Sequence, residues 1–208
     1  MPVREFKEGV YVVMATQQGK IKKSSLQLFS NPRKGGIIAI TLGKGDKLVG
    51  SVLSEGTDEV CLATREGKAI RFREKDIRPM GRSAQGVKGI NLRKKDMVVG
   101  MIKVDPHGAF LTVTEKGYGK RTDFEEYRLQ SRGGSGIINL KVVDKNGPVV
   151  GIRTVRDSNE IMLITKHGMV VRVPVNGISK VGRGAQGVRV IGLKKSDVVT
   201  SLASVVAK

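Results

Sequence analysis

The stretch EVCLATREGKAIRFREKDIRPMGRSAQGVKGINLRKKDMVVGMIKVD, residues 59–105, is a unit that recurs along the chain. It reads as a short apolar strand over residues 60–64, a tight turn at Gly67 and a basic strand over residues 69–73. A polar crossover carrying Arg82 and Gly86 follows, and then two more apolar strands around residue 90 and over residues 98–102. Short runs rich in β-branched residues and bounded by Gly, Asn or Asp are typical of strands.

Two series of glycines keep the same period. The pattern Thr-x-x-Gly ends at Gly19, Gly67, Gly117 and Gly168, at intervals of 48, 50 and 51 residues. The glycines at the end of the crossovers are Gly36, Gly86, Gly136 and Gly187, at intervals of 50, 50 and 51 residues. Periods of this length, built from strands, are typical of propeller blades or of an array of them.

We therefore predict an all-β, propeller-like array of four blades, each a four-stranded antiparallel sheet, in a single domain over residues 1–208. The repeats run over about residues 10–58, 59–108, 109–159 and 160–208. One repeat is too small to bury a core alone, so each must pack on its neighbours. In the first repeat we expect strands at residues 10–16, 20–23, 37–42 and 48–53. In the third we expect them at residues 110–114, 137–142 and 149–155, and in the fourth at residues 161–165, 170–173, 188–193 and 198–205. No helix is predicted.

Composition and charge restrict the functional classes. No apolar run approaches the ~18 residues of a membrane span, and the first residues lack the apolar core of a signal peptide. The single Cys61 cannot form an internal disulfide, and we expect it to be buried and inert, so a cytoplasmic location is predicted. The net charge of +19 is spread over all four repeats, as +4, +6, +3 and +6, which indicates a positive surface for a polyanion.

The sequence gives little support for a nucleotide-binding site or a metal site. The run Gly182-Arg-Gly-Ala-Gln-Gly187 matches G-x-G-x-x-G, but a strand is predicted after it where a dinucleotide site needs a helix. His107 and His167 lie at turns with no second ligand at metal spacing. The recurring turn residues Asp46, Asp96 and Asp197 are expected to cap the backbone. We predict no cofactor, no metal and no catalytic residue in this chain.

Two rows of basic residues keep a constant phase. Lys23, Arg71, Arg121 and Arg172 stand four residues after the turn glycines. In the crossovers, Arg82, Arg132 and Arg183 stand four residues before the second glycine, and Arg33 stands three before it. Because side chains alternate along a strand, a fixed offset places a row on equivalent points of equivalent blades. Protection of sheet edges by Lys and Arg is the alternative explanation.

We interpret the rows as a track for double-stranded DNA, bound through its phosphates. Nothing in the sequence resembles a helix for the major groove, and the aromatic residues form no repeated row for stacking bases. Reversing Arg71, Arg121 and Arg172 to Glu is predicted to abolish binding without unfolding. The predicted DNA contacts are Lys22, Lys23, Arg33, Lys34, Arg71, Arg73, Arg82, Lys88, Lys120, Arg121, Arg132, Arg172, Arg183 and Arg189.

The repeated Thr-x-x-Gly followed by a basic strand, the segment Glu115-Lys-Gly-Tyr-Gly-Lys-Arg-Thr122 and the segment Val181-Gly-Arg-Gly-Ala-Gln-Gly187 resemble the C-terminal domain of the DNA gyrase A protein over essentially the whole chain. The related protein of topoisomerase IV is similar too. The resemblance implies a β-pinwheel whose blades exchange a strand and whose basic rim wraps DNA. It also implies a non-catalytic module of an ATP-dependent bacterial topoisomerase associated with the nucleoid. Its partners would be the rest of the gyrase A protein and the gyrase B protein, two copies of each.

The sequence departs from that family in two ways. The family commonly has six blades, and this chain has four that look like the later ones, so we expect a truncated or shortened domain. The family's gyrase box, a Gln-Arg-Arg-Gly-Gly-Lys-Gly heptad, has its nearest match at Gln130-Ser-Arg-Gly-Gly-Ser-Gly136. That match is either a degenerate crossover or a working box. A protein-binding propeller remains the alternative of another class, although such arrays carry repeated aromatic signatures and Trp is absent.

Overall fold

The computed structural model describes residues 3–205 and confirms the all-β, bladed fold. The first two repeats form β1 (Tyr11–Thr16), β2 (Lys20–Ser25), β3 (Leu48–Ser54), β4 (Glu59–Thr64), β5 (Lys68–Arg73), β6 (Val87–Lys88) and β7 (Val98–Lys103). The last two form β8 (Ala109–Thr114), β9 (Tyr118–Asp123), β10 (Ile137–Ile138), β11 (Val149–Val155), β12 (Glu160–Thr165), β13 (Val170–Pro174), β14 (Val188–Arg189) and β15 (Val199–Val205). Most predicted strands are therefore confirmed to within a residue or two.

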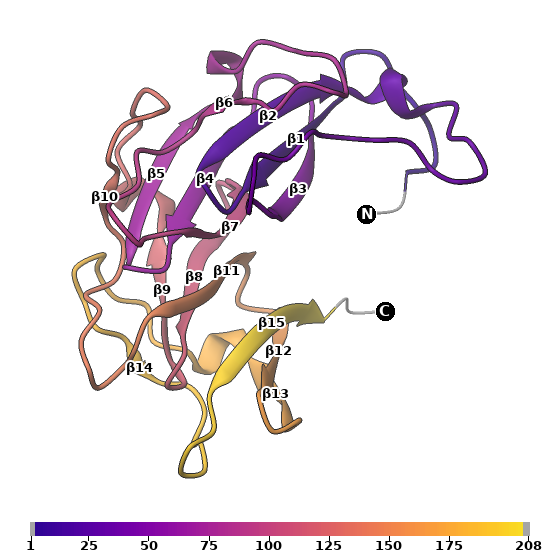
Figure 1. Cartoon of the computed structure of the whole chain (residues 1–208). Helices are drawn as coiled ribbons and strands as arrows, with labels where there is room; N and C mark the ends of the chain where they lie inside the picture. The colour runs from indigo at the N-terminus through magenta and orange to yellow at the C-terminus, as the bar shows by residue number, and fades with distance from the viewer. Residues whose placement is uncertain (1–2, 206–208) are drawn as a thin grey trace. The chain divides into compact units, whose positions relative to one another are not determined.

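Each repeat makes one antiparallel sheet, and each of the first three repeats receives its outer strand from the next repeat. The sheet orders are β3-β1-β2-β6, β10-β5-β4-β7, β11-β8-β9-β14 and β13-β12-β15. Figure 1 shows β6, from the second repeat, along the edge of β2 in the first. Strand exchange between blades is thus confirmed. In the fourth sheet, β13 is an edge strand within the described part of the chain.

The third strand of each repeat is shorter than predicted. β6, β10 and β14 have two residues each, and residues 37–42 of the first repeat form no strand. The ladder between this strand and the preceding repeat ends early, because the carbonyl of that repeat's turn glycine accepts hydrogen bonds from two successive N–H groups. Gly19 O, for example, accepts from Gly89 N at 2.8 Å and from Ile90 N at 3.2 Å.

Four short 3₁₀ helices also differ from the prediction of no helix. Each follows the second strand of its repeat and begins the crossover. They are η1 (Leu26–Phe29), η2 (Glu74–Asp76), η3 (Phe124–Glu126) and η4 (Val175–Gly177). Runs of three or four residues are usual for this helix type, because its hydrogen-bond geometry is poor. Each one buries a residue at its start, such as Leu26 or Phe124.

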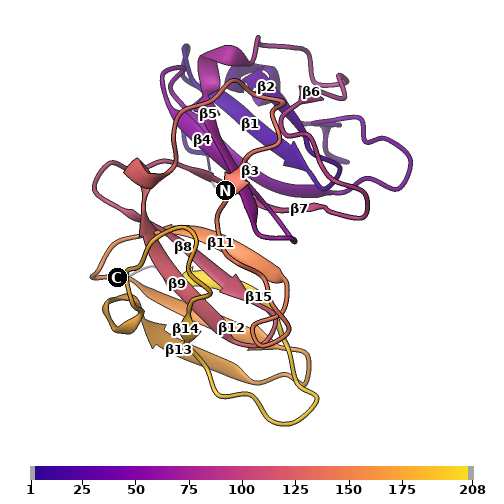
Figure 2. The ribbon, with the colours of Figure 1, turned by 90° about the vertical axis from the view of Figure 1, so that its left-hand side faces the viewer.

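The chain has two compact units, each with its own apolar core. The first comprises Met1–Leu62, Ile70–Lys103 and Leu129–Gly136, and the second comprises Ala63–Ala69, Val104–Arg128 and Ile137–Lys208. In the first unit, Val13 and Ala15 of β1 pack with Val60 and Leu62 of β4. In the second, Leu111 of β8 packs with residues of β12 such as Leu163. Figure 2 shows the strands of the second unit, with β14 beside β9.

Candidate nucleic-acid interface

The four basic residues that stand four positions after the turn glycines each form an ion pair with an acidic residue of the same chain. Lys23 Nζ lies 3.1 Å from Glu74 Oε1, and the two side chains are 6% and 0% exposed. Arg71 Nε lies 2.6 Å from Glu59 Oε2. Arg121 pairs with Asp157, and Arg172 pairs with Glu160. This row therefore neutralises acidic residues, and only Arg172, with 62% of its side chain exposed, reaches far into solvent.

Two lysines one residue earlier, Lys22 and Lys120, donate to backbone carbonyls of the crossovers. Lys22 Nζ donates to Ala39 O at 2.7 Å and to Arg82 O. Lys120 Nζ donates to Gly182 O and Arg183 O, at 2.7 Å each. Burial lowers the pKa of Lys22, and it lowers the pKa of Lys120 to about 8. Both ammonium groups act as internal donors to backbone carbonyls.

The structure corrects the predicted surface positions of Lys22, Lys23, Lys120 and Arg121, because all four are buried. Both faces of these strands are buried, so the alternation of side chains brings neither lysines nor arginines to the surface here. Lys23 and Arg121 contact the next repeat, and Lys22 and Lys120 donate to crossover carbonyls. For Arg121, Nε donates to Ile178 O at 2.6 Å, and its backbone N–H donates to Ser179 O at 3.0 Å. Reversing such a residue should unfold its neighbourhood, contrary to the expectation for the triple Glu variant.

The crossover arginines lie differently. Arg82, Arg132 and Arg183 each donate Nη1 to a carbonyl two residues after the preceding second glycine: Ile38 O at 3.4 Å, Lys88 O at 3.0 Å and Ile138 O at 2.7 Å. Within residues 3–205, none of the three has a carboxylate within ion-pair distance of its guanidinium. No described carboxylate therefore offsets the charge of these half-buried guanidinium groups, and each has further N–H donors.

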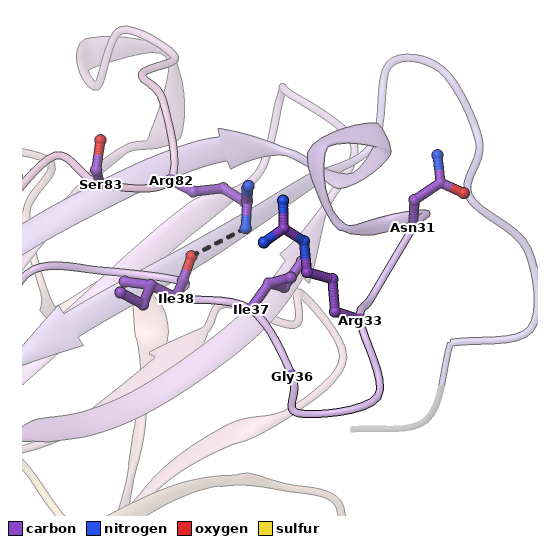
Figure 3. Close-up of a pocket in the computed structure, with 7 residues that line it drawn as sticks. All are labelled: Asn31, Arg33, Gly36, Ile37, Ile38, Arg82 and Ser83. Carbon is purple, nitrogen blue, oxygen red and sulfur yellow. Dashed lines mark hydrogen bonds between the residues drawn. The ribbon is translucent and has the colours of Figure 1, made fainter.

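A pocket of about 730 Å³ lies at the first of these links. Figure 3 shows the guanidinium groups of Arg33 and Arg82 side by side over residues 36–38, with Asn31 and Ser83 at the rim. The described residues that line it include no acidic side chain. Two guanidinium forks with amide and hydroxyl groups nearby suit a phosphate, which arginine binds through paired N–H bonds.

In the first unit, the crossovers of three successive repeats are joined through these contacts. Arg82 donates to Ile38 O of the first crossover, and Arg132 donates to Lys88 O of the second. Gly133 N also donates to Gly89 O at 2.7 Å. Arg33, Arg82, Lys88 and Arg132, which we call the crossover strip, thus lie on adjoining segments of one compact unit. Lys34 and Arg73 of the same unit are exposed.

The second unit repeats the link once. Arg183 holds the crossover that contains Ile138. Arg189, on β14, is exposed and lies over Tyr118, with its guanidinium carbon 5.8 Å from the ring centroid. The predicted residues Arg183 and Arg189 therefore stand on the crossover of the fourth repeat.

Sequence reasoning missed further exposed cations with a repeated phase. Arg78 and Arg128 both stand eight residues before a second glycine, and both are exposed. Lys44, Lys94 and Lys195 are exposed and stand two residues before the turn residues Asp46, Asp96 and Asp197. The same offset count that produced the two rows would have found them.

The remaining sequence predictions on sites concern turns and the thiol. Asp46 Oδ1 accepts from Gln18 N at 2.9 Å and from Lys47 N at 2.8 Å, and Asp197 Oδ1 accepts from Val198 N at 2.9 Å, so the capping role is confirmed. Cys61 is fully buried as predicted, and burial raises the pKa of its thiol. The described residues include no group of three or more potential metal ligands. Within residues 3–205, no helix is both long and apolar enough to span a membrane.

The possible gyrase box, residues 130–136, occupies an ordinary crossover position. Gln130 N donates to Arg71 O at 2.9 Å, as Met80 N does to Lys23 O and Val181 N does to Arg121 O. Its backbone geometry is therefore that of the other crossovers.

The chain is similar to known proteins along its whole length. The family described as "DNA gyrase C-terminal domain, beta-propeller" matches four times, at residues 11–54, 58–105, 109–156 and 159–205. The DNA gyrase A protein of Salmonella typhimurium is 49% identical over 202 residues, which are 97% of this chain and 23% of that protein. The Staphylococcus epidermidis protein of the same name is 44% identical over 197 residues, which are 94% of this chain and 22% of that protein. The chain spans about a quarter of the curated relatives it matches.

Two solved structures are similar to this chain in fold. A structure of the DNA gyrase A C-terminal domain superposes with a TM-score of 0.88 at 28% identity, covering 98% of this chain and 68% of that one. A crystal structure of the C-terminal domain of DNA topoisomerase IV superposes with a TM-score of 0.92 at 26% identity, covering 99% of this chain and 64% of that one. With four matches that follow its four repeats, the chain belongs to the family of DNA gyrase C-terminal domains.

Proposed function

We propose that this chain binds double-stranded DNA through backbone phosphates, and that the crossover arginines make the contacts. The observation that carries the proposal is the Arg33–Arg82 pocket, where two guanidinium groups meet without an acidic neighbour among the lining residues. The crossover strip extends this feature over three repeats of the first unit. Phosphate contacts of this kind position DNA without reading its sequence.

The structure narrows the proposed contacts. The proposal no longer includes the buried Lys22, Lys23, Lys120 and Arg121, nor Arg71, whose Nε is engaged by Glu59. It includes these residues: Arg33, Lys34, Arg73, Arg82, Lys88, Arg132, Arg183 and Arg189, with Arg172 as an exposed, ion-paired neighbour.

The test is equilibrium binding of a labelled duplex to a crossover variant with Arg33→Gln, Arg82→Gln and Arg132→Gln. Glutamine removes the charge and keeps an amide that donates to a carbonyl. A matched control carries Lys7→Gln, Lys47→Gln and Lys166→Gln, three exposed positions outside the strip. We expect the crossover variant to lose at least tenfold in affinity and the control to lose much less. Equal losses would mean that only net charge matters and would contradict the proposed site.

For the whole protein, we propose that the chain is the C-terminal module of a DNA gyrase A protein in the bacterial cytoplasm. There it would bend or wrap DNA so that the gyrase A and B proteins together introduce negative supercoils with ATP. The support is the 49% identity to the DNA gyrase A protein of Salmonella typhimurium. The alternative is a topoisomerase IV component, favoured by the similar superposition on that enzyme's C-terminal domain. A supercoiling assay on relaxed plasmid with the full-length protein separates them, since only gyrase would leave the plasmid negatively supercoiled.

A further inference from the structure

Where an exchanged strand joins the preceding repeat, one residue of each repeat lies directly opposite one of the other. The residue two positions after the second glycine pairs with the residue one position after the turn glycine of the preceding repeat. Residues directly opposite each other in an antiparallel pair lie on the same face of the sheet, and their side chains interact. The pairs among the described residues are Lys88 with Lys20, Ile138 with Lys68, and Arg189 with Tyr118.

Two of these pairs contain a single charge. Lys68 lies opposite an apolar side chain, that of Ile138. Arg189 lies opposite Tyr118, where its Nη2 donates to the tyrosine hydroxyl at 3.5 Å and its guanidinium carbon lies 5.8 Å from the ring centroid. An aromatic ring attracts a cation over its face. Neither pair therefore places two cations opposite each other.

The pair at the first junction, between β2 and β6, contains two charges of the same sign. Both residues belong to the first compact unit, and Lys20 is half-buried whereas Lys88 is exposed. Within residues 3–205, neither ammonium group has a carboxylate within ion-pair distance. Like charges directly opposite each other destabilise a pair of strands. The free protein therefore contains an unfavourable interaction here, which a bound anion would relieve.

The segments around this lysine pair contain no acidic residue. Residues 16–23 carry Lys20, residues 81–95 carry Lys88, and residues 129–136 form the crossover next to them. None of the three segments includes Asp or Glu. Their composition therefore leaves the charge of the pair to be offset by an anion from outside these segments.

Neutral contacts position both lysines. Lys20 Nζ donates to Gln85 Oε1 at 2.6 Å, and an ammonium group carries several N–H donors, so it can donate further. The stem of Lys88 lies against the third crossover, because a Cβ at Gly133 would be 3.8 Å from Lys88 Cγ and Cδ. Arg132 of the same crossover donates Nη1 to Lys88 O at 3.0 Å. The pair thus adjoins an arginine of the crossover strip.

We propose that Lys20 and Lys88 together bind one phosphate of the DNA backbone, at the edge where β6 joins β2. This inference rests on the proposed DNA binding and adds Lys20 to the contacts, a residue that belongs to neither basic row. Hydrogen bonds from ammonium groups to phosphate oxygens are charge-assisted and strong. A phosphate between the two lysines replaces their repulsion with two attractive contacts, so the relief of repulsion adds to the affinity for DNA.

Reversal of one charge tests the pair, because it should change stability and DNA affinity in opposite directions. Lys20→Glu places a carboxylate opposite Lys88, so the melting temperature of the DNA-free chain should rise at low salt, and the rise should shrink at about 1 M salt. The affinity of this variant for a labelled duplex should fall by about tenfold or more. Lys88→Glu should behave in the same way.

Lys68→Glu is the matched control. Lys68 occupies the same position of the next repeat and is also half-buried, but it lies opposite Ile138. The substitution changes the net charge by the same amount as Lys20→Glu. The melting temperature of the control should not rise, and its loss of duplex affinity should be much smaller than that of Lys20→Glu.

The double variant Lys20→Glu with Lys88→Glu separates a pairwise effect from a general effect of net charge. It places two carboxylates opposite each other, so its melting temperature should fall below those of both single variants, although its net charge is lower still. A double variant more stable than both single variants, or a Lys20→Glu variant that loses no more affinity than Lys68→Glu, would overturn the proposal. Wild-type affinity in the crossover variant would instead contradict the proposed DNA site, so the two proposals can fail separately.

Discussion

At the scale of single residues, the basic side chains divide into two functional groups. Those that stand four residues after a turn glycine pair with carboxylates, as Lys23 does with Glu74. The crossover arginines donate to one or two backbone carbonyls, as Arg82 does to Ile38 O and Arg132 does to Asp76 O and Lys88 O, and they have no acidic partner among the described residues. The high net charge therefore serves both the interior of the repeats and the proposed DNA contact.

The Lys23–Glu74 pair should be essential to stability. Removing one partner of a buried pair leaves the other charge uncompensated, which costs about 3–5 kcal/mol. Glu74→Gln should therefore lower the free energy of unfolding, measured by urea denaturation, by an amount of that order. Glu160→Gln, which removes the partner of the exposed Arg172, is the matched control and should cost less than ~1 kcal/mol. Similar values for the two variants would contradict the different roles of the two pairs.

Lys120 should make stability depend on pH. Burial lowers its pKa in the folded chain to about 8, below the roughly 10.4 of an unfolded lysine. The unfolded chain therefore binds more protons between these values, so the free energy of unfolding should rise as pH increases from about 8 to 10. Below pH 8 the cost of burying the charged ammonium is fully present. In Lys120→Met this contribution to the slope should be absent. An equal slope in both proteins would show that Lys120 does not titrate as inferred.

At the scale of elements, the junction between repeats is the unit of construction. A turn glycine with positive φ presents its carbonyl to two N–H groups of the following repeat, and that contact limits the third strand to two residues. The 3₁₀ helix and the crossover then place an arginine over the preceding crossover.

Alanine substitutions at two turn glycines should measure what a filled junction contributes. At Gly67, φ is +77° and a Cβ would press into the Leu140 carbonyl, closer than real Cβ atoms approach. Gly67→Ala should therefore cost strain and overpacking together, about 2–5 kcal/mol. At Gly168, φ is +83° but the space is open, so Gly168→Ala should cost only the backbone strain, roughly 1 kcal/mol. Thermal unfolding of the two variants provides the comparison, and equal losses would contradict the filled-versus-open distinction.

Much of the element level could be predicted from sequence, because it depends on local signals. The Thr-x-x-Gly turns and the β-branched runs placed β11 to the residue and most other strands within two. Residues 37–42 were predicted to be a strand and form none. In the other repeats this segment forms a two-residue strand by pairing with the preceding repeat, and no described segment pairs with residues 37–42. The interior position of Lys23 and Arg121 depends on which face meets the next repeat, and spacing along one strand cannot determine that. A partial signal existed, since Glu59 and Glu160 each precede a row arginine by 12 residues.

At the scale of the whole molecule, the central claim is that the crossover arginines, which lack acidic partners among the described residues, bind DNA, and that the more regular row on the strands does not. Each unit supplies its own part, with the crossover strip in the first unit and Arg183 and Arg189 in the second. The claim explains why the net charge is spread over all repeats although many cations are internally paired.

The most direct test is the salt dependence of duplex affinity for the wild-type chain and for the variant with Arg33→Gln, Arg82→Gln and Arg132→Gln. Each phosphate contact adds about 0.9 to the slope of log affinity against log salt concentration. If each arginine binds one phosphate, the slope should become shallower by about 2.7, while Lys7→Gln, Lys47→Gln and Lys166→Gln together should leave it near the wild-type value. An unchanged slope in the crossover variant, with wild-type affinity, would contradict the central claim.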